Sequence, residues 1–387
     1  MGKSFAKGPL VLLVTLLVGF GLMELGLRLL MSFPLTTRSN QVEHSQLLRT
    51  LSPSYSGIDR HGFRNPEDLQ ASIAAIGDSH TYGVNAFDTQ TWPAHLGRLS
   101  DRGVYNFGVQ GYNIYQYLVL FEMALERGFE DIIVAVYPAN DVNPGSTCST
   151  LELSYWQDRL AASELHLPKC ARRRTGDRGE AEEKQPAPFW DRILAHARLR
   201  EHPEVRTFLR RIALVSAFEH LVWDPYLHVW LMGDDKAHTR DYGRFEKEDL
   251  EEIRREVSLK DAIIRANLAN FRTIMKTMKR RADEQGVGFG VLLIPSKYRV
   301  YWEYGRQKDD QLPDLVDRAM RAEDELAQRM ERILAQLEVP TRDVTPVLVN
   351  RVGPSLDGGP RLYPPNDTHP KGYGYRIYAE AAMPLLR

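Results

Sequence analysis

Cysteine is scarce in this sequence, which holds only Cys148 and Cys170. Two cysteines are too few for a small scaffold built on disulfides, and their spacing matches no zinc-binding pattern. One bridge between them would require an oxidising compartment and would stabilise the fold by roughly 3 kcal/mol. Two unrelated free thiols fit the pair equally well, so the location of the chain decides between the two interpretations.

An excess of charge of one sign is also lacking, because 50 Lys and Arg residues face 51 Asp and Glu residues, a net charge of -1. This balance leaves no global field that would attract nucleic acid, and we expect no nucleic-acid partner. The sequence contains no internal repeat. Its 387 residues, 43% of them hydrophobic, suffice for one large core with an insertion or for two modest domains.

What the sequence does have is a long apolar run at residues 9–33. Twenty-five residues in a helix span about 37 Å, enough to cross a bilayer with some tilt. Glu24 and Arg28 interrupt the run four positions apart, so on a helix they share a face and partly neutralise each other. Lys3 and Lys7 precede it, which favours a cytoplasmic N-terminus.

A cleaved signal peptide is the alternative interpretation of this run, but its apolar region should be shorter and end at a small-x-small site. No clear site of that kind is present. We therefore expect an uncleaved transmembrane anchor at 1–34 and a connecting segment at 35–70. The chain would be a single-pass membrane protein whose remaining part lies outside the cytoplasm, in the periplasm or at the cell surface.

Beyond residue 70, short apolar runs alternate with stretches of helical periodicity. Strands are expected at 72–76, 104–107, 132–137, 287–294 and 344–349, and helices at 91–99, 114–127, 247–284, 313–337 and 372–385, the third of these broken near Ser258. This alternation predicts an α/β fold with a parallel sheet that helices cover on both faces. The pattern is interrupted at about 145–250, which we interpret as a helical insertion or lid within one domain at 71–387.

Four polar segments fall where strands are expected to end or the last helix to begin. Gly-Asp-Ser-His at 77–80 follows the first strand, Gly-Val-Gln-Gly at 108–111 the second and Pro-Ala-Asn-Asp at 138–141 the third. Asn-Asp-Thr-His-Pro at 366–370 precedes the last helix. Because the carboxyl ends of parallel strands meet at one edge of a sheet, we expect the four segments to form one site.

Each segment supplies one part that acyl transfer requires. Ser79 offers a nucleophilic hydroxyl, and His369 a base that titrates near neutral pH. Gly111 lets its N–H approach an oxyanion closely, and the amide of Asn140 offers a second neutral donor. Taken singly, such residues are common in turns and caps. Their joint occurrence at strand ends favours a catalytic site.

These segments resemble the conserved blocks of the SGNH/GDSL hydrolases, which carry Ser, Gly, Asn and His. The resemblance covers about 71–145 and 287–385. It implies the three-layer, doubly wound, flavodoxin-like sheet of that superfamily. It also implies a catalytic Ser79 and His369, and needs no metal or organic cofactor.

The same resemblance implies an oxyanion hole formed by the backbone N–H groups of Ser79 and Gly111 and the side chain of Asn140. The third block of the family usually begins with glycine, where this chain has Pro138. The family's acid normally stands three residues before the histidine, where this chain has Asn366. Asp367 stands two before it, a spacing similar to that in the polysaccharide O-acetyltransferase branch, so Asp367 is the expected acid.

Two further side chains fall at the same edge of the predicted sheet. His80 adjoins the nucleophile and is expected to be structural, because sequence neighbours seldom share a productive geometry. Lys297 follows the fourth strand and is expected to be a solvated surface lysine. Binding of an anionic substrate or carboxylate is the alternative for Lys297. The aromatic residues of 222–230 and 298–304 are expected in the core, with a sugar groove as the alternative.

Three functions fit this sequence. An esterase would remove acyl groups from a glycan or lipid of the cell envelope. An O-acyltransferase would modify an exported polysaccharide, with acyl groups received through a multi-spanning membrane partner, and the anchor and the Asp-Thr-His spacing lean towards it. A non-catalytic carbohydrate-binding or assembly protein on the same scaffold is the third, and an intact Ser79 and His369 count against it.

Overall fold

The computed structural model describes residues 15–16, 18–23, 41–53, 57–161, 165, 250, 253–254, 257–310, 312–364 and 367–387. Most of the anchor predicted at 1–34 and of the insertion predicted at about 145–250 lies outside these residues. Both segments, and the domain boundaries drawn from them, stay predictions. In the described part of the chain, no helix is both long enough and apolar enough to cross a membrane.

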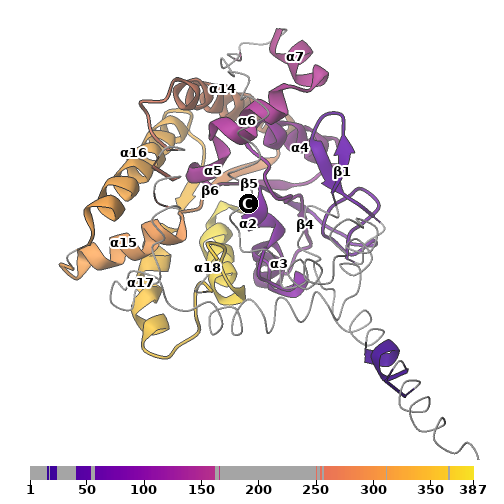
Figure 1. Ribbon diagram of the computed structural model, residues 1–387. Coiled ribbons are helices and arrows are strands. Elements are labelled where there is room, and N and C mark those ends of the chain that lie inside the picture. The colour runs from indigo at the N-terminus through magenta and orange to yellow at the C-terminus, as the bar shows by residue number, and fades with distance from the viewer. Residues whose placement is uncertain are drawn as a thin grey trace, which may run out of the picture.

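A five-stranded parallel sheet forms the centre of the fold (Figure 1). Its strands are β3 (Ile73–Ile76), β4 (Val104–Asn106), β5 (Asp131–Val136), β6 (Gly288–Leu293) and β7 (Thr341–Asp343). They lie in the order β4-β3-β5-β6-β7. The second strand of this sheet therefore lies outside the first, which is the order of flavodoxin-like doubly wound folds. The predicted α/β class with a parallel sheet is confirmed.

Helices cover both faces of this sheet, so the fold has three layers. One face packs against α4 (Ile114–Glu126), α14 (Ala262–Gln285) and α16 (Asp314–Gln336), and the other against α3 (Trp92–Ser100), α17 (Thr345–Leu356) and α18 (Gly372–Ala382). Along β5, Ile132 and Val134 face the first layer and Ile133 the second. A strand buried on both sides needs apolar residues on both sides, which explains its uninterrupted apolar run.

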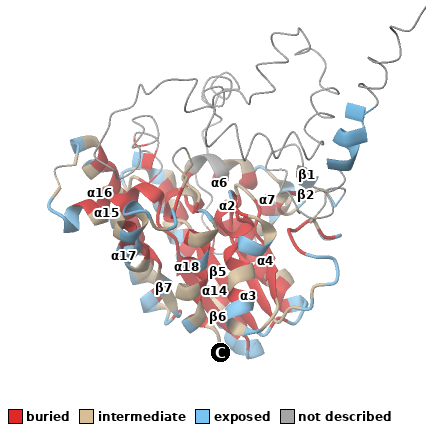
Figure 2. Ribbon diagram, turned by 90° about the horizontal axis from the view of Figure 1, so that it is seen from below, coloured by how far each residue is buried: buried red, intermediate tan, exposed pale blue. Residues whose placement is uncertain are grey.

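Burial is concentrated at the middle of the molecule. Figure 2 shows the buried residues gathered around β5, α4 and α18, with exposed residues towards the rim. All six residues of β5 and all six of β6 are buried. The two strands pair in parallel along this whole length, from Asp131 opposite Gly288 to Val136 opposite Leu293. The sheet is therefore most rigidly held at the strand whose end carries the segment at 138–141.

The prediction of a strand at 344–349 is wrong, because this segment begins the helix α17 and the strand β7 ends just before it. Asp343 ends the strand, and its Oδ1 accepts a hydrogen bond from the backbone N–H of Thr345 at 2.8 Å. This bond satisfies one of the free N–H groups at the start of the helix. Leu348 and Val352 are fully buried four positions apart, which is helical and not strand periodicity.

Several regular elements, among them a helix and a hairpin, were not predicted from the sequence. The helix α15 (Lys297–Gln307) follows β6, and Ser296 caps it by accepting the N–H of Arg299 at 3.0 Å. The strands β1 (Gln41–His44) and β2 (Leu48–Leu51) pair as an antiparallel hairpin within the segment interpreted as irregular. The core prediction for the aromatic residues of α15 is confirmed at Tyr298, Tyr301 and Trp302, which are all buried.

The remaining predicted helices are present with small differences at their ends. Those at 91–99, 114–127 and 313–337 correspond to α3, α4 and α16. The last, at 372–385, is divided into α18 and the short 3-10 helix η4 (Met383–Leu385). The long predicted helix at 247–284 is described only from 257 onward without gaps, and there it begins at Ala262 after the cap Asp261.

Several short helices follow β3 and β5 along the chain. They are α2 (Ser79–Tyr82), η2 (Asp88–Gln90), α5 (Pro138–Asp141), α6 (Pro144–Leu151) and α7 (Ser154–Ala161). Cys148 lies in α6 and is disulfide-bonded. Cys170, the only other cysteine of the sequence, lies outside the described residues.

Candidate active site

A tight turn between β3 and α2 presents Ser79. Asp78 caps α2 by accepting the backbone N–H of His80 at 2.9 Å, and the helix ends after one turn at Gly83, whose φ of 86° is left-handed. Ser79 is the first residue of α2 and is partly exposed, while its neighbours on both sides are buried. The turn therefore leaves Ser79 partly exposed, while the residues on either side of it at the end of β3 are buried.

Two glycines let the neighbouring loops pack against this turn. A Cβ added to Gly77 would lie 2.0 Å from Oγ1 of Thr81, and one added to Gly108 would lie 2.1 Å from the backbone nitrogen of Tyr82. Both chain segments thus approach α2 more closely than any side chain allows. Glycine at the ends of β3 and β4 is explained by this close approach.

Ser79, His369 and Asp367 form a continuous chain of hydrogen bonds. Oγ of Ser79 lies 2.8 Å from Nε2 of His369, although the two residues are 290 positions apart. Nδ1 of His369 lies 2.6 Å from Oδ1 of Asp367, which also accepts the backbone N–H of His369 at 2.8 Å. With its proton on Nδ1, where the carboxylate accepts it, the neutral ring presents Nε2 to the serine hydroxyl. Asn366, the alternative acid position, lies outside the described residues.

Asp367 and His369 each stabilise the charged form of the other. Burial disfavours the charged form of Asp367, but the charge of His369 and the hydrogen bonds from that residue outweigh it and hold the pKa of Asp367 at about 2. Burial would lower the pKa of His369, but the Asp367 carboxylate outweighs this effect and raises the pKa above its ordinary value of 6.5. Asp367 is therefore a carboxylate at neutral pH, and His369 is a stronger base than an isolated histidine.

His80 is buried beside this chain of hydrogen bonds, as its structural interpretation requires. Only 1% of its surface is exposed, and its ring centroid lies 4.8 Å from that of His369 and 4.6 Å from that of Tyr137. Burial, and then the charge of His369, lower the pKa of His80 well below 6.5. His80 is therefore a neutral side chain that packs against the imidazole of His369.

The proposed oxyanion donors lie at the same edge of the sheet. Asn140, in α5 after β5, donates from Nδ2 to Oδ2 of Asp78 at 3.1 Å, and the same oxygen lies 3.4 Å from Oγ of Ser79. A primary amide carries two N–H groups, so this bond orients Asn140 beside the nucleophile and leaves its second N–H for a substrate oxygen. Gly111 follows β4, with a left-handed φ of 76°, and its carbonyl accepts from Nη2 of Arg49 at 3.4 Å.

Asp78 is a part of the site to which the sequence interpretation gave no role. Its side chain is 1% exposed and links the amide of Asn140, the hydroxyl of Ser79 and the start of α2. Burial raises the pKa of this carboxyl, against hydrogen bonds and a histidine charge that lower it. The side chain of Asp78 thus caps α2 and also connects Ser79 to Asn140.

Arg64, from the segment interpreted as a connection, supports the turn from behind. Its guanidinium donates to the carbonyls of Tyr82, Gly83 and Ala86 at 2.9, 3.0 and 2.9 Å. These carbonyls lie at and beyond the end of α2, where a helix leaves acceptors without partners. Only 6% of Arg64 is exposed. No sequence signal marks such a residue, because its partners are backbone groups common to every residue type.

The prediction that Lys297 is a solvated surface lysine is wrong. Only 3% of Lys297 is exposed, and its Nζ donates to the carbonyl of Pro364 at 2.8 Å and to that of Asp367 at 3.2 Å. The side chain points into the loop that carries Asp367 and His369.

Within the described residues, no group of three or more His, Cys, Asp or Glu side chains is arranged to hold a metal ion.

Comparison with known proteins gives little guidance. No family model matches the chain, and no curated protein matches it. Among solved structures, the chain is similar to a protein from Desulfitobacterium hafniense DCB-2 whose description names the G-D-S-L family of lipolytic proteins. The match has 13% identity and a TM-score of 0.37, and covers 82% of this chain and 100% of that one. A similarity this low carries no argument, so the site has to be interpreted from its own geometry.

Proposed function

We propose that this chain is a serine esterase or O-acyltransferase of the SGNH/GDSL type that transfers acyl groups through Ser79. One observation carries the proposal, namely the hydrogen-bonded chain from Ser79 through His369 to Asp367, with distances of 2.8 and 2.6 Å. A hydroxyl, an imidazole and a carboxylate in this order are the parts of a serine nucleophile site, whatever the fold. The position of Ser79 at the carboxyl end of β3 supports the same interpretation.

The reaction begins when Oγ of Ser79 attacks the carbonyl carbon of an ester while Nε2 of His369 takes the hydroxyl proton. Asp367 stabilises the imidazolium that forms. The negative oxygen of the tetrahedral intermediate accepts hydrogen bonds from the backbone N–H groups of Ser79 and Gly111 and from Asn140. Losing one such donor typically lowers kcat by about 10²–10³-fold.

The intermediate then collapses, the bond to the alcohol breaks, and His369 returns its proton to the leaving oxygen. The acyl group stays on Ser79 as an ester. In the second half, His369 takes a proton from water or from a sugar hydroxyl, whose oxygen attacks the acyl carbon. The bond to Oγ of Ser79 then breaks, and His369 returns the proton to Oγ, which restores free Ser79 and neutral His369. Water as acceptor gives an esterase and a sugar hydroxyl gives an acyltransferase, with no cofactor in either half.

A fluorophosphonate probe tests the nucleophile directly. We expect the purified protein to be labelled at Ser79 and Ser79→Ala to abolish labelling. Ser100→Ala is the matched control, because this serine ends α3 and its Oγ donates to the carbonyl of Leu96 within the same helix. Folded protein that resists the probe would contradict the proposal and favour a non-catalytic carbohydrate-binding or assembly protein.

The acyl acceptor separates the two enzymatic versions. We propose an acylated polysaccharide or lipid outside the cytoplasm as the substrate, on the basis of the apolar N-terminal run and the disulfide at Cys148, since disulfides persist in oxidising compartments. Acetate release from a model ester is measured with and without oligosaccharide. Acyl-oligosaccharide that forms at the expense of free acetate identifies the transferase, for which a multi-spanning membrane protein would supply the acyl group.

Membrane attachment through the N-terminal run remains a proposal of its own. A fusion of alkaline phosphatase to the C-terminus tests it, because that enzyme folds only where its disulfides form. We expect an active fusion in the membrane fraction. An inactive fusion, or an active one released from the membrane, would contradict the single-pass, extracytoplasmic assignment.

A further inference from the structure

A buried lysine contacts the loop that supplies two of the three proposed catalytic residues. Lys297 is the first residue of α15, and its Nζ donates to the carbonyls of Pro364 and Asp367, 67 and 70 positions further along the chain. Only 3% of the residue is exposed. Lysine is rarely buried to this degree, because removal of an ammonium group from water is unfavourable unless other groups replace that water. We therefore expect the contact between Lys297 and this loop to serve a function.

The described part of this loop, 362–364 and 367–371, is also held by hydrogen bonds from other residues, among them one from the Asn85 side chain to Asp367. Its base is closed by one hydrogen bond from the N–H of Lys371 to the carbonyl of Leu362, at 2.8 Å. The carbonyl of His369 accepts a long 3.4 Å bond from the exposed amide of Asn85. The bonds from Lys297 act on the carbonyls of Pro364 and Asp367. They hold the backbone of the residue whose carboxylate orients the imidazole.

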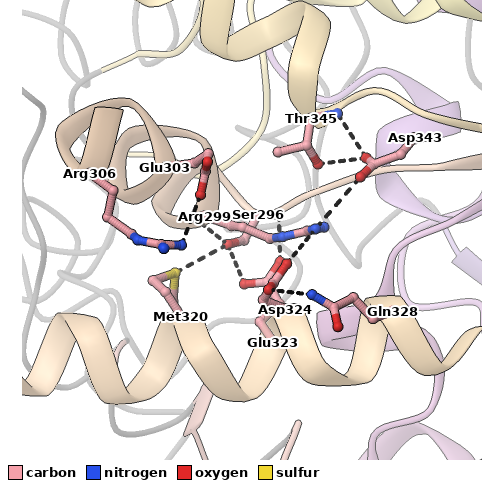
Figure 3. A network of polar contacts seen from close by, with 10 residues as sticks. All are labelled: Ser296, Arg299, Glu303, Arg306, Met320, Glu323, Asp324, Gln328, Asp343 and Thr345. Carbon is pink, nitrogen blue, oxygen red and sulfur yellow. Dashed lines mark hydrogen bonds and ion pairs between the residues drawn. The ribbon is translucent and has the colours of Figure 1, made fainter. Parts of the chain in front are cut away.

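The residue directly before Lys297 is hydrogen-bonded to α16. Ser296, directly before it, donates from its N–H and from its Oγ to the carboxylate of Glu323, at 2.9 and 2.6 Å. Glu323 is fully buried, and Figure 3 shows its carboxylate beneath Ser296 at the start of α15. Arg299 continues the network to Asp324 at 2.8 Å and to Asp343 at 3.6 Å. The start of α15 is thus tied both to the neighbouring helix and to the end of β7.

We propose that Lys297 is a positioning residue that holds the backbone at Asp367 so that His369 stays within reach of Ser79. This inference rests on the function proposed above. Lys297 does not touch the reacting atoms. It acts through the carbonyl of Asp367, whose side chain fixes the imidazole through the 2.6 Å bond to Nδ1.

Chemistry explains why lysine suits this task. An ammonium group carries three N–H donors on a compact charge, so it can serve two carbonyls at once, and bonds from a charged donor are stronger than neutral ones. A neutral side chain of the same length would fill the space without holding the carbonyls. Displacement of a catalytic group by about 1 Å can lower the rate by about 10²-fold. Loss of this contact should therefore act on kcat and much less on KM.

The experiment compares Lys297→Met with Lys297→Arg and the control Lys308→Met in the full chain. Lys308 is the C-cap residue directly after the same helix and is exposed. We expect Lys297→Met to lower kcat and the rate of fluorophosphonate labelling by about 10–10²-fold with little change in KM. Lys297→Arg, which keeps the charge and several donors, recovers most of the loss. Lys308→Met behaves like wild type.

A spectroscopic measurement separates positioning from general stability. A proton shared between Nδ1 of His369 and Asp367 gives a far-downfield proton resonance, which Asp367→Asn should remove as a reference. We expect Lys297→Met to lose or shift this resonance while thermal unfolding stays cooperative. If that variant does not unfold cooperatively, Lys297→Gln is judged by the same criteria. A kcat, labelling rate and resonance equal to those of Lys308→Met would overturn the inference.

The same data distinguish the two proposals. Wild-type protein that resists the probe would contradict the proposed function, while the resonance still decides whether Lys297 positions His369. Wild-type protein that is labelled, alongside an unchanged Lys297→Met variant, would contradict the positioning role alone.

Discussion

The two neighbouring histidines of the site have their pKa values moved in opposite directions. The pKa of His369 is raised because the Asp367 carboxylate outweighs burial, whereas burial, and then the charge of His369, lower the pKa of His80. Only one of two adjacent imidazoles can readily hold a proton, and the carboxylate decides which one it is. In the proposed reaction, the proton taken from Ser79 would thereby be directed to a single acceptor.

The acid limb of the pH–rate profile tests this arrangement. His369 must be neutral to act as a base, so kcat/KM should fall below a midpoint that lies above pH 6.5. Asp367→Asn removes the carboxylate that raises the pKa, so the midpoint should move to lower pH. At the optimum, kcat should be about 10³–10⁴-fold lower, since an amide favours the wrong tautomer.

Asp68→Asn is a suitable control for this prediction because Asp68 is exposed. An unchanged midpoint in Asp367→Asn would contradict the role of Asp367 and direct attention to Asn366. The same shift also affects stability. Since the pKa of Asp367 is lowered to about 2 from its usual 3.8, its contribution is present above pH 3.8 and is lost as the pH falls towards 2.

At the scale of elements, the short helix α2 and the loop before α18 are contacted by long, buried cationic side chains from other segments. Arg64 supports the end of α2, and Lys297 supports the loop before α18. Both cations bond backbone carbonyls, and a carbonyl has no residue type that a sequence pattern could reveal. The strands and the four polar segments could be predicted because apolar runs and turn residues are visible in the sequence. The buried cations that hold these segments could not.

Replacement of Arg64 measures one such support. Arg64→Met removes three hydrogen bonds from a charged donor and leaves buried carbonyls without it. We expect the free energy of unfolding to fall by about 2–4 kcal/mol, as measured by urea denaturation. Labelling of Ser79 should also slow, because α2 carries the nucleophile. Arg60→Met is the control, since its side chain is 73% exposed. Equal stability of the two variants would contradict the supporting role.

The start of α17 shows a different limit of sequence-based prediction. The apolar residues at 344–349 are compatible with a strand, and short apolar runs do not distinguish the two periods. The hydrogen bond from Thr345 to Asp343 and the burial of Leu348 and Val352 stabilise a helix only once the neighbouring layers are in place. Local sequence placed the element correctly within a few residues but assigned the wrong type.

For the molecule as a whole, the order of strands explains where the site forms. In a flavodoxin-like order, the first and third strands along the chain lie side by side. The connections that follow them run towards opposite edges of the sheet, so a crevice opens between their carboxyl ends. These strands are β3 and β5, and they carry Ser79 and Asn140. The alternation of strands and helices could be predicted from the sequence. The segment at 145–250 has no comparable periodicity.

Stability should depend most on the central strand, which both cores share. Ile133 in β5 is fully buried against the layer of α3, α17 and α18. We expect Ile133→Ala to lower the free energy of unfolding by about 2–5 kcal/mol, through lost burial and a cavity, as measured by thermal and urea unfolding. Val42→Ala, in the hairpin and 41% exposed, should change it far less. Similar effects of both changes would contradict a shared central core.

The separation of 290 positions between the serine hydroxyl and the imidazole has a consequence for biosynthesis. Domains fold as the chain emerges from the ribosome, N-terminal part first. The turn that carries Ser79 can therefore form early, whereas the imidazole of His369 emerges only 290 residues later. If the proposed function is correct, a growing or truncated chain that stops before His369 carries an inert serine, and acyl transfer begins only after the two distant segments have met.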